Sequence, residues 1–338
     1  MKFFKLFILI SIFSISAFAQ EDTTKVIKPT HKVFASIYTA GYYNFNTTKP
    51  NAGFDVSTAL IGYSFKKSDI LKFTLIYDVT RTTNGITVLD TAGNQLPVYY
   101  FEGSKYTAFL KMAELKWNFA KNFSLATGQL LNQQYLTVQD KFWAHRYVMV
   151  TMQELYRMAN PADFGMRVEY KNKETFAFSL GAVNGNGPFR KQDTLSTIQY
   201  NTNFELYLIN NLLIKAFVAI TPATFETDNN ISTAFSGFVA YKQKKYSIGV
   251  EYSYTDNVAF TPVIFSGVSA FAMYNVTPKW EIFGRYDYVD NSGIVKLNNT
   301  YVTGFQYKPE KNLFISVNYR YWSSSEISQI YFNVGAKF

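Results

Sequence analysis

Apolar and polar residues alternate one by one along much of the chain. In KYSIGVEYSYT, at positions 245–255, one set is apolar or aromatic and the other is polar: Tyr246, Ile248, Val250, Tyr252 and Tyr254 against Ser247, Gly249, Glu251 and Ser253. Alternation with a period of two places the two sets on opposite faces of a β-strand. The strand therefore separates an apolar environment on one side from a polar environment on the other.

The same pattern recurs through the chain and predicts an all-β fold. We expect sixteen strands, at about residues 32–45, 54–66, 69–80, 105–119, 122–131, 163–171, 173–183, 199–209, 212–221, 231–242, 244–255, 261–275, 278–288, 299–308, 312–322 and 326–338. Fourteen or eighteen strands also fit, because the third and fourth are poorly delimited. The stretch from 20 to 338 contains no linker and no low-complexity tract that would mark a second domain.

The connections between these strands alternate between short and long. Short polar turns occur, for example, at 120–122 and 210–211, whereas 81–104, 132–162 and 184–198 are long. Short turns on one side and long loops on the other are typical of an outer-membrane barrel, and a soluble sandwich would not need them. The sequence thus predicts a transmembrane antiparallel β-barrel whose lipid-facing side is apolar and whose interior is polar.

The first nineteen residues, MKFFKLFILISIFSISAFA, have the pattern of a secretory signal peptide. Lys2 and Lys5 precede an apolar run, and Ala17 and Ala19 form a small-residue cleavage site. A membrane anchor is the alternative, but the run is short compared with the roughly 20 residues that a span needs. We therefore expect residues 1–19 to be removed and 20–338 to form the barrel in the cell outer membrane.

Composition narrows the chemistry. The chain has 26 Tyr and 32 Phe, no Cys and two His. Aromatic girdles at the two interfaces of a barrel explain the aromatic content. Metal sites built on Cys or on several His are excluded, and we expect no metal, no cofactor and no nucleic-acid partner. Lysines are frequent in the short turns, where solvation of the turns is a simpler explanation than a functional basic patch.

The predicted interior carries charges of both signs. The alternation directs these basic and acidic side chains inward: Lys72, Lys116, Arg167, Lys215, Arg285 and Arg320, with Asp78, Glu114, Glu169, Glu205, Glu251, Glu281 and Asp287. Rings of one sign would select ions of the opposite sign, whereas mixed walls predict modest selectivity. Inward Gly and Ser residues indicate open space inside the barrel.

The connection 132–162 is about twice as long as its neighbours and unusually apolar. An apolar loop of this length left outside would expose a sticky patch, so we expect it to fold inward as a constriction loop, helical near 150–158. The alternative is an external loop that packs on other loops or on a partner. Folded inward, it would place Phe142, Trp143, Tyr147 and Leu155 on the wall, and Asp140, Lys141, Arg146, Glu154 and Arg157 in a narrowed passage beside Arg167 and Glu169.

The last strand is amphipathic and ends in an aromatic residue. Ile330, Phe332 and Val334 share a face with Phe338 at the end of the sequence. This arrangement resembles the signal that outer-membrane assembly machinery reads, so we expect Phe338 to contact that machinery.

Three segments resemble the core of the phosphate-selective porin O and P family: ATGQLLNQQYLT, LYRMANPADFGMRVEY and FSLGAVNGNG, within residues 122–187. The matching features are Gly128 before the loop, an Asp-x-Gly at Asp163, and the Asn-Gly turn at Asn184. The resemblance implies a sixteen-stranded, homotrimeric porin that passes small solutes or ions. The resemblance links phosphate selectivity to a ladder of Arg and a cluster of Lys along the pore. In this chain the only candidates near the constriction are Arg146, Arg157 and Arg167, and acidic residues accompany them.

The resulting functional hypothesis is passive diffusion of small hydrophilic solutes or ions, with anion preference as a finer option. A non-conducting barrel for adhesion or scaffolding is a second hypothesis. An outer-membrane enzyme is a third, disfavoured because neither His31 nor His145 has an identifiable strand-borne Ser or Asp partner. We therefore expect no catalytic residues.

Overall fold

A computed structural model of the chain describes residues 28–46, 51–86, 99–172, 175–189, 192, 196–208, 211–222, 230–257, 263–291 and 295–338. The predicted signal peptide at 1–19 lies outside these residues. Among them, no helix is both long and apolar enough to cross a membrane.

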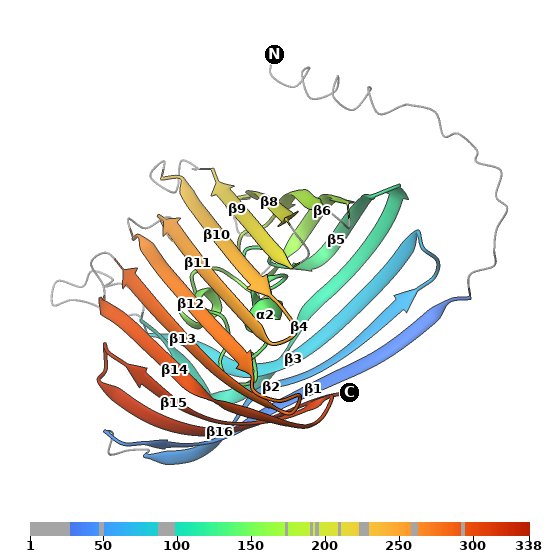
Figure 1. The fold of residues 1–338 in the computed structure, drawn as a ribbon. Helices are drawn as coiled ribbons and strands as arrows, with labels where there is room; N and C mark the ends of the chain where they lie inside the picture. The colour runs from blue at the N-terminus through green and yellow to red at the C-terminus, as the bar shows by residue number, and fades with distance from the viewer. Residues whose placement is uncertain are drawn as a thin grey trace, which may run out of the picture.

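The described residues form one closed antiparallel barrel of sixteen strands, which confirms the predicted fold class (Figure 1). The strands are β1 (Thr30–Asn44), β2 (Ala52–Lys66), β3 (Leu71–Ile86), β4 (Tyr99–Ala120), β5 (Phe123–Leu131), β6 (Ala162–Asn172), β7 (Phe176–Val183), β8 (Gln199–Leu208), β9 (Leu212–Thr221), β10 (Ser232–Lys242), β11 (Tyr246–Asp256), β12 (Phe265–Asn275), β13 (Trp280–Asn291), β14 (Val295–Glu310), β15 (Leu313–Trp322) and β16 (Ile327–Lys337).

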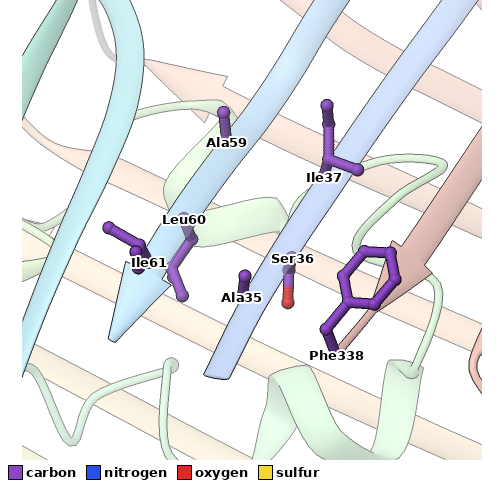
Figure 2. Close-up of a pocket in the computed structure, with 7 residues that line it drawn as sticks. All are labelled: Ala35, Ser36, Ile37, Ala59, Leu60, Ile61 and Phe338. Carbon is purple, nitrogen blue, oxygen red and sulfur yellow. The ribbon is translucent and has the colours of Figure 1, made fainter. Parts of the chain in front are cut away.

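Each strand pairs with its sequence neighbours, and β1 pairs with β16 to close the barrel. Phe338 and Ala35 exchange backbone hydrogen bonds of 2.9 and 3.2 Å at this seam. Figure 2 shows the Phe338 side chain next to Ser36 and Ile37 of β1, at one side of a shallow apolar hollow that also borders Ala59, Leu60 and Ile61 of β2. The final residue therefore completes the sheet while its ring stays on the outer surface.

The alternation of burial along the strands matches the alternation in the sequence. In β11 the apolar set from Tyr246 to Tyr252 is exposed on the outside, whereas Ser247, Glu251 and Ser253 are buried inside. Large exposed apolar side chains recur on the outer face of nearly every strand. An outer surface this apolar needs an apolar surrounding, and the interior retains the charges.

The third and fourth strands extend well beyond their predicted limits. The sequence predicted 69–80 and 105–119, but β3 continues to Ile86 and β4 begins at Tyr99. The extension contains TRTTNG, a polar stretch without alternation, so its sequence carries no amphipathic strand signal. Pairing of the two strands with each other holds this hairpin beyond the limits that the hydrophobic pattern indicates.

A β-bulge changes the direction of one charged side chain. Ile76 pairs with Met112 and Tyr77 with Leu110, so Lys111 is the extra residue in β4. Strict alternation would have turned Lys111 outward, where a charge facing lipid at mid-depth costs about 2–4 kcal/mol. The bulge turns it inward instead, and its Nζ lies 2.6 Å from Oδ2 of Asp78.

One glycine in β5 has a backbone conformation that other residues rarely adopt. Gly128 has φ +110°, and a Cβ there would lie 2.1 Å from the carbonyl oxygen of Ala113 in β4. We predict that Gly128→Ala destabilises the barrel by at least about 1–3 kcal/mol, visible as a loss of folded yield and a lower unfolding midpoint.

Gly284→Ala is the matched control for this substitution. A Cβ at Gly284 would meet only the carbonyl oxygen of Val302, at 3.8 Å, which is ordinary contact. Equal stability losses in the two variants would contradict the prediction.

Candidate constriction site

The segment between β5 and β6 leaves and re-enters the wall at one point. The Asn132 amide donates to the Pro161 carbonyl at 2.9 Å, and its side-chain amide donates to the Asn160 carbonyl at 2.8 Å. Leu131 pairs directly with Ala162. We call residues 132–161 the lumen loop, since everything between these bonds projects from a single position on the wall.

The lumen loop lies inside the barrel, as the apolar content predicted. It contains two short helices, α2 (Gln139–Trp143) and α3 (Met152–Leu155), and Figure 1 shows α2 within the ring of strands. Helix α3 falls within the predicted 150–158, whereas α2 had no signal in the sequence. Trp143 and Tyr147 are buried, and Phe142 and Leu155 pack on the same core, so the four residues expected on the wall contact it.

The loop follows the inner wall from β7 round to β1 and then back to β11. Gln133 accepts a hydrogen bond from Ser179 on β7, and Phe142 and Trp143 contact Phe238 on β10 and Phe271 on β12. Further contacts follow along the path: Tyr147 with Gln306, Phe314 and Tyr38, Gln153 with Ser236, Tyr156 with Thr300, and Met158 with Thr255. These contacts lie on β7 and on the strands from β10 round to β1.

Polar wall side chains hold the loop by its backbone carbonyls. Arg320 on β15 donates to the Val148 carbonyl at 2.5 Å, and Arg285 on β13 donates to the Val150 carbonyl at 2.5 Å. Lys215 on β9 donates to the carbonyls of Gln133 and Gln134, and Asn333 on β16 donates to that of Tyr147 at 3.1 Å. These four side chains are the loop anchors; they satisfy carbonyls that the lumen loop cannot pair internally.

Small inward residues accommodate the loop and do not leave open space along this wall. A Cβ at Gly335 on β16 would lie 3.0 Å from the Cβ of Tyr147, and one at Gly267 on β12 would lie 3.1 Å from the Met152 sulfur. The expectation that inward Gly indicates an empty interior is therefore wrong at these two positions. Close packing of the lumen loop requires the missing side chains.

Three of the predicted site residues form one cluster on the lumen loop. Arg146 donates two hydrogen bonds to Glu154, at 2.5 and 2.6 Å, and a third to Asp140 at 3.2 Å. Burial opposes ionisation of Glu154, but the charge and hydrogen bonds of Arg146, with the charge of Lys111, outweigh it and lower the pKa of Glu154.

The two predicted site residues that lie on a strand, Arg167 and Glu169, belong to a second cluster, on β4 and β6. Arg167 donates to Glu169 at 2.7 Å and lies 3.6 Å from Glu114, while Lys116 pairs with Glu169. The four charges cancel. Lys116 keeps 29% of its side chain exposed, so this cluster is accessible to solvent inside the barrel.

Two predicted site residues stay apart from both clusters. Lys141 and Arg157 are exposed, and no ion pair joins either of them to another described residue.

Lys111 and Asp78 form a further ion pair on the inner wall, and Lys111 was not among the residues that the sequence predicted to point inward. The sequence did contain a signal for Lys111. Simple alternation would place its charge on the lipid side, and a charge at such a position indicates a break in the alternation.

His145 has a strand-borne partner that the sequence analysis did not identify. Its Nε2 lies 2.7 Å from a carboxylate oxygen of Glu281 on β13, and its Nδ1 lies 2.8 Å from the Trp143 carbonyl. The residue is 1% exposed, so both contacts lie away from solvent. His145 thus fixes the turn after α2 to the wall. Within the described residues, no group of three or more His, Asp or Glu is arranged to hold a metal.

The fold is that of outer-membrane porins. OmpF of Salmonella typhi, in a complex with daunomycin, matches with a TM-score of 0.65 and 11% identity over 91% of this chain and 97% of that one. The outer membrane channel DcaP of Acinetobacter baumannii matches with 0.64 and 12%, over 92% and 98%. The anion-selective porin from Comamonas acidovorans matches with 0.62 and 10%, over 92% and 99%.

These identities establish the architecture alone. No protein-family model and no curated protein sequence matches the chain. The outer-membrane barrel class is therefore supported by shape, whereas the narrower resemblance to phosphate-selective porins rests on the three short segments in the sequence.

The loop anchors generate a direct prediction about loop mobility. Because the chain has no Cys, Thr151→Cys introduces a single thiol at a position that is 4% exposed. Adding Arg320→Met removes the donor to Val148, and a hydrogen bond to a charged group contributes about 1.5–3 kcal/mol. We expect the maleimide labelling rate at position 151 to rise at least about tenfold, because local opening becomes easier.

Lys337→Met in the same Thr151→Cys background is the control. Lys337 is a cation at the end of β16 whose ammonium lies over the Phe314 ring and makes no hydrogen bond to the lumen loop. It should leave the labelling rate unchanged. An unchanged rate in the Arg320→Met variant as well would contradict the anchoring role.

The lowered pKa of Glu154 generates a second prediction. The ordinary pKa of a glutamate carboxyl, taken for the unfolded chain, is 4.5, and the pKa of Glu154 in the folded protein is lower. Such a carboxyl stabilises the fold at pH values above its unfolded-state pKa. This stabilisation is lost as the pH falls through its folded-state pKa. We expect Glu154→Gln to lower the free energy of unfolding by about 1–3 kcal/mol at neutral pH, and this difference to shrink as the pH falls below 4.5. Urea unfolding in lipid vesicles measures the difference, and its disappearance above pH 4.5 would contradict the pairing.

Proposed function

We propose that the protein is an outer-membrane diffusion channel for small hydrophilic solutes or ions. The observation that carries this proposal is the position of the lumen loop, which lies inside the barrel against the wall from β7 round to β1. The other five strands, β2 to β6, carry partly exposed charged side chains, including Lys116 and Glu169. A polar passage bordered by a fixed loop is the arrangement that limits solutes by size.

The passage proposed here runs between the lumen loop and the wall of β3 to β6. Asp140, Arg146 and Glu154 border it on the loop side, and Glu114, Lys116, Arg167 and Glu169 border it on the wall side. In this arrangement the charged groups of the two sides act together on a passing solute. The seven sequence-predicted site residues would then share one function, with Lys141 and Arg157 at its edges.

Selectivity between ions is modest in this proposal. Arg146 and Arg167 are both paired with carboxylates, so neither presents an uncompensated charge. Lys141 and Arg157 are exposed without ion pairs among the described residues, and they supply a mild anion preference. The resemblance to phosphate-selective porins supports the same direction, although the paired arginines argue against a strong phosphate filter.

The remaining sequence expectations form part of the proposal. Residues 1–19 direct export, Phe338 is read by the assembly machinery, and membrane lipids surround the apolar outer face. A homotrimer is the proposed assembly. In support, OmpT of Vibrio cholerae, whose structure is described as a trimer form, shares this architecture with a TM-score of 0.58 and 12% identity, over 92% of this chain and all of that one.

Single-channel recording in a planar bilayer with a salt gradient tests the proposal. We expect stable conductance steps and a reversal potential that indicates mild anion preference. Arg146→Gln leaves Asp140 and Glu154 uncompensated and should shift the reversal potential towards cations. Glu154→Gln removes a negative charge and should shift it towards anions.

Glu310→Gln is the control, since Glu310 is an exposed carboxylate at the end of β14, outside the proposed passage. It should change neither conductance nor selectivity. A folded barrel without conductance would contradict the channel and favour a scaffold. That second candidate is supported by the burial of most inward side chains from β8 to β16 beneath the lumen loop.

A further inference from the structure

Exposed lysines gather at the end of the barrel where the short turns lie. We call this set the lysine rim: Lys66, Lys67, Lys121, Lys171, Lys244, Lys245, Lys279 and Lys311. Each lies in a short turn or at a strand end beside one. The acidic residues described among the same turns and strand ends are Asp69, which pairs with Lys66, and Glu310. The rim therefore carries a net charge of 8 − 2 = +6 over these residues.

The described residues at the opposite end of the barrel do not show this excess of positive charge. Apart from the lumen loop, the described residues of the long connections contain one charged side chain, Glu326, and it is acidic. If the lysines served only to keep the connections in water, a similar charge would be expected at both ends of the barrel. A concentration of one sign at one end indicates that the lysine rim faces a specific, negatively charged environment.

Aromatic side chains locate the rim relative to a bilayer. Seven of the eight lysines, all except Lys311, have an aromatic residue one or two positions away in the chain: Phe65, Phe119, Phe123, Tyr170, Tyr246 and Trp280. Several of these rings are exposed on the outer face, with Trp280 at 44% and Phe123 at 40%. Aromatic belts mark the level of lipid headgroups, so the adjacent ammonium groups reach the phosphates.

Neighbouring turns reinforce one another. The Lys245 carbonyl accepts from the Asn275 amide across β11 and β12, and the Lys279 carbonyl accepts from the Lys308 amide across β13 and β14. Successive short turns are separated by two strand spacings, about 10 Å, which is close to the Debye length in physiological salt. The fields of Lys244, Lys245, Lys279 and Lys311 therefore overlap.

We propose that the lysine rim binds anionic phospholipid headgroups in the leaflet that borders the short turns, and so selects the lipids around the barrel. A lysine near an anionic membrane surface favours association about fivefold, and several acting together give a marked preference over zwitterionic lipid. The inference depends on the bilayer placement and not on conduction.

Brominated lipids provide the test, because Trp117 and Trp280 are exposed on the outer face near the lysine rim, while Trp143 is buried beneath the lumen loop. The full chain is reconstituted into phosphatidylcholine vesicles containing a small fraction of brominated phosphatidylglycerol or brominated phosphatidylcholine. We expect tryptophan quenching to report several-fold stronger association of the anionic lipid at low salt, with the preference reduced at high salt.

Two matched variants separate charge from folding. Changing Lys244, Lys245, Lys279 and Lys311 to Gln should bring the preference near one, whereas changing the same four to Arg should retain it. Equal quenching by both lipids in the unmodified protein would overturn the proposal. So would a preference that survives the Gln changes. Loss of quenching by both lipids would contradict bilayer placement itself, and single-channel conductance, measured separately, distinguishes that outcome from failure of the channel function.

Discussion

The hydrogen bonds from the barrel wall to the carbonyls of the lumen loop are the constraint on which the rest of the interior depends. An irregular segment inside a barrel has carbonyls without partners of their own, and cationic side chains buried beside it need acceptors. Both requirements are met by three hydrogen-bonded contacts between wall and loop. Arg320 donates to the Val148 carbonyl, Arg285 to the Val150 carbonyl, and Lys215 to the carbonyls of Gln133 and Gln134. Neither the loop nor these buried cations would be stable in this position without the other.

This constraint divides the barrel interior into two unequal parts. From β7 round to β1 the wall is covered, and its inward glycines and serines provide room for aromatic side chains such as Tyr147. From β2 to β6 it carries paired charges such as Lys116 with Glu169. The proposed passage lies along these strands because the covered part is needed to hold the loop.

Charge serves different purposes at different depths. Inside, most cations have a carboxylate or carbonyl partner, so the interior is close to neutral and specific contacts dominate. At the short turns the lysines project outward beside aromatic rings, and their collective field reaches beyond the protein. The same residue type thus holds the loop at Lys215 and faces the headgroup level at Lys279, depending on burial and available acceptors.

The sequence by itself determined the antiparallel barrel class and the inner or outer position of most side chains, because alternation with a period of two is a local property. It limited the strand number to fourteen to eighteen, and the closed structure established sixteen. It also indicated that the lumen loop folds inward, since its apolar residues need cover. It did not determine what the inner charges contact. Arg285 and Arg320 were expected among the inward charges, but the sequence did not show that they bind loop carbonyls 135 and 172 residues away. It also did not show that the carboxylate of Glu281 lies beside the His145 ring. Helix α2 and the bulge at Lys111 were also decided by packing and pairing. Contacts between segments so distant in the chain depend on the closed barrel, which brings them together only after every strand has found its neighbour.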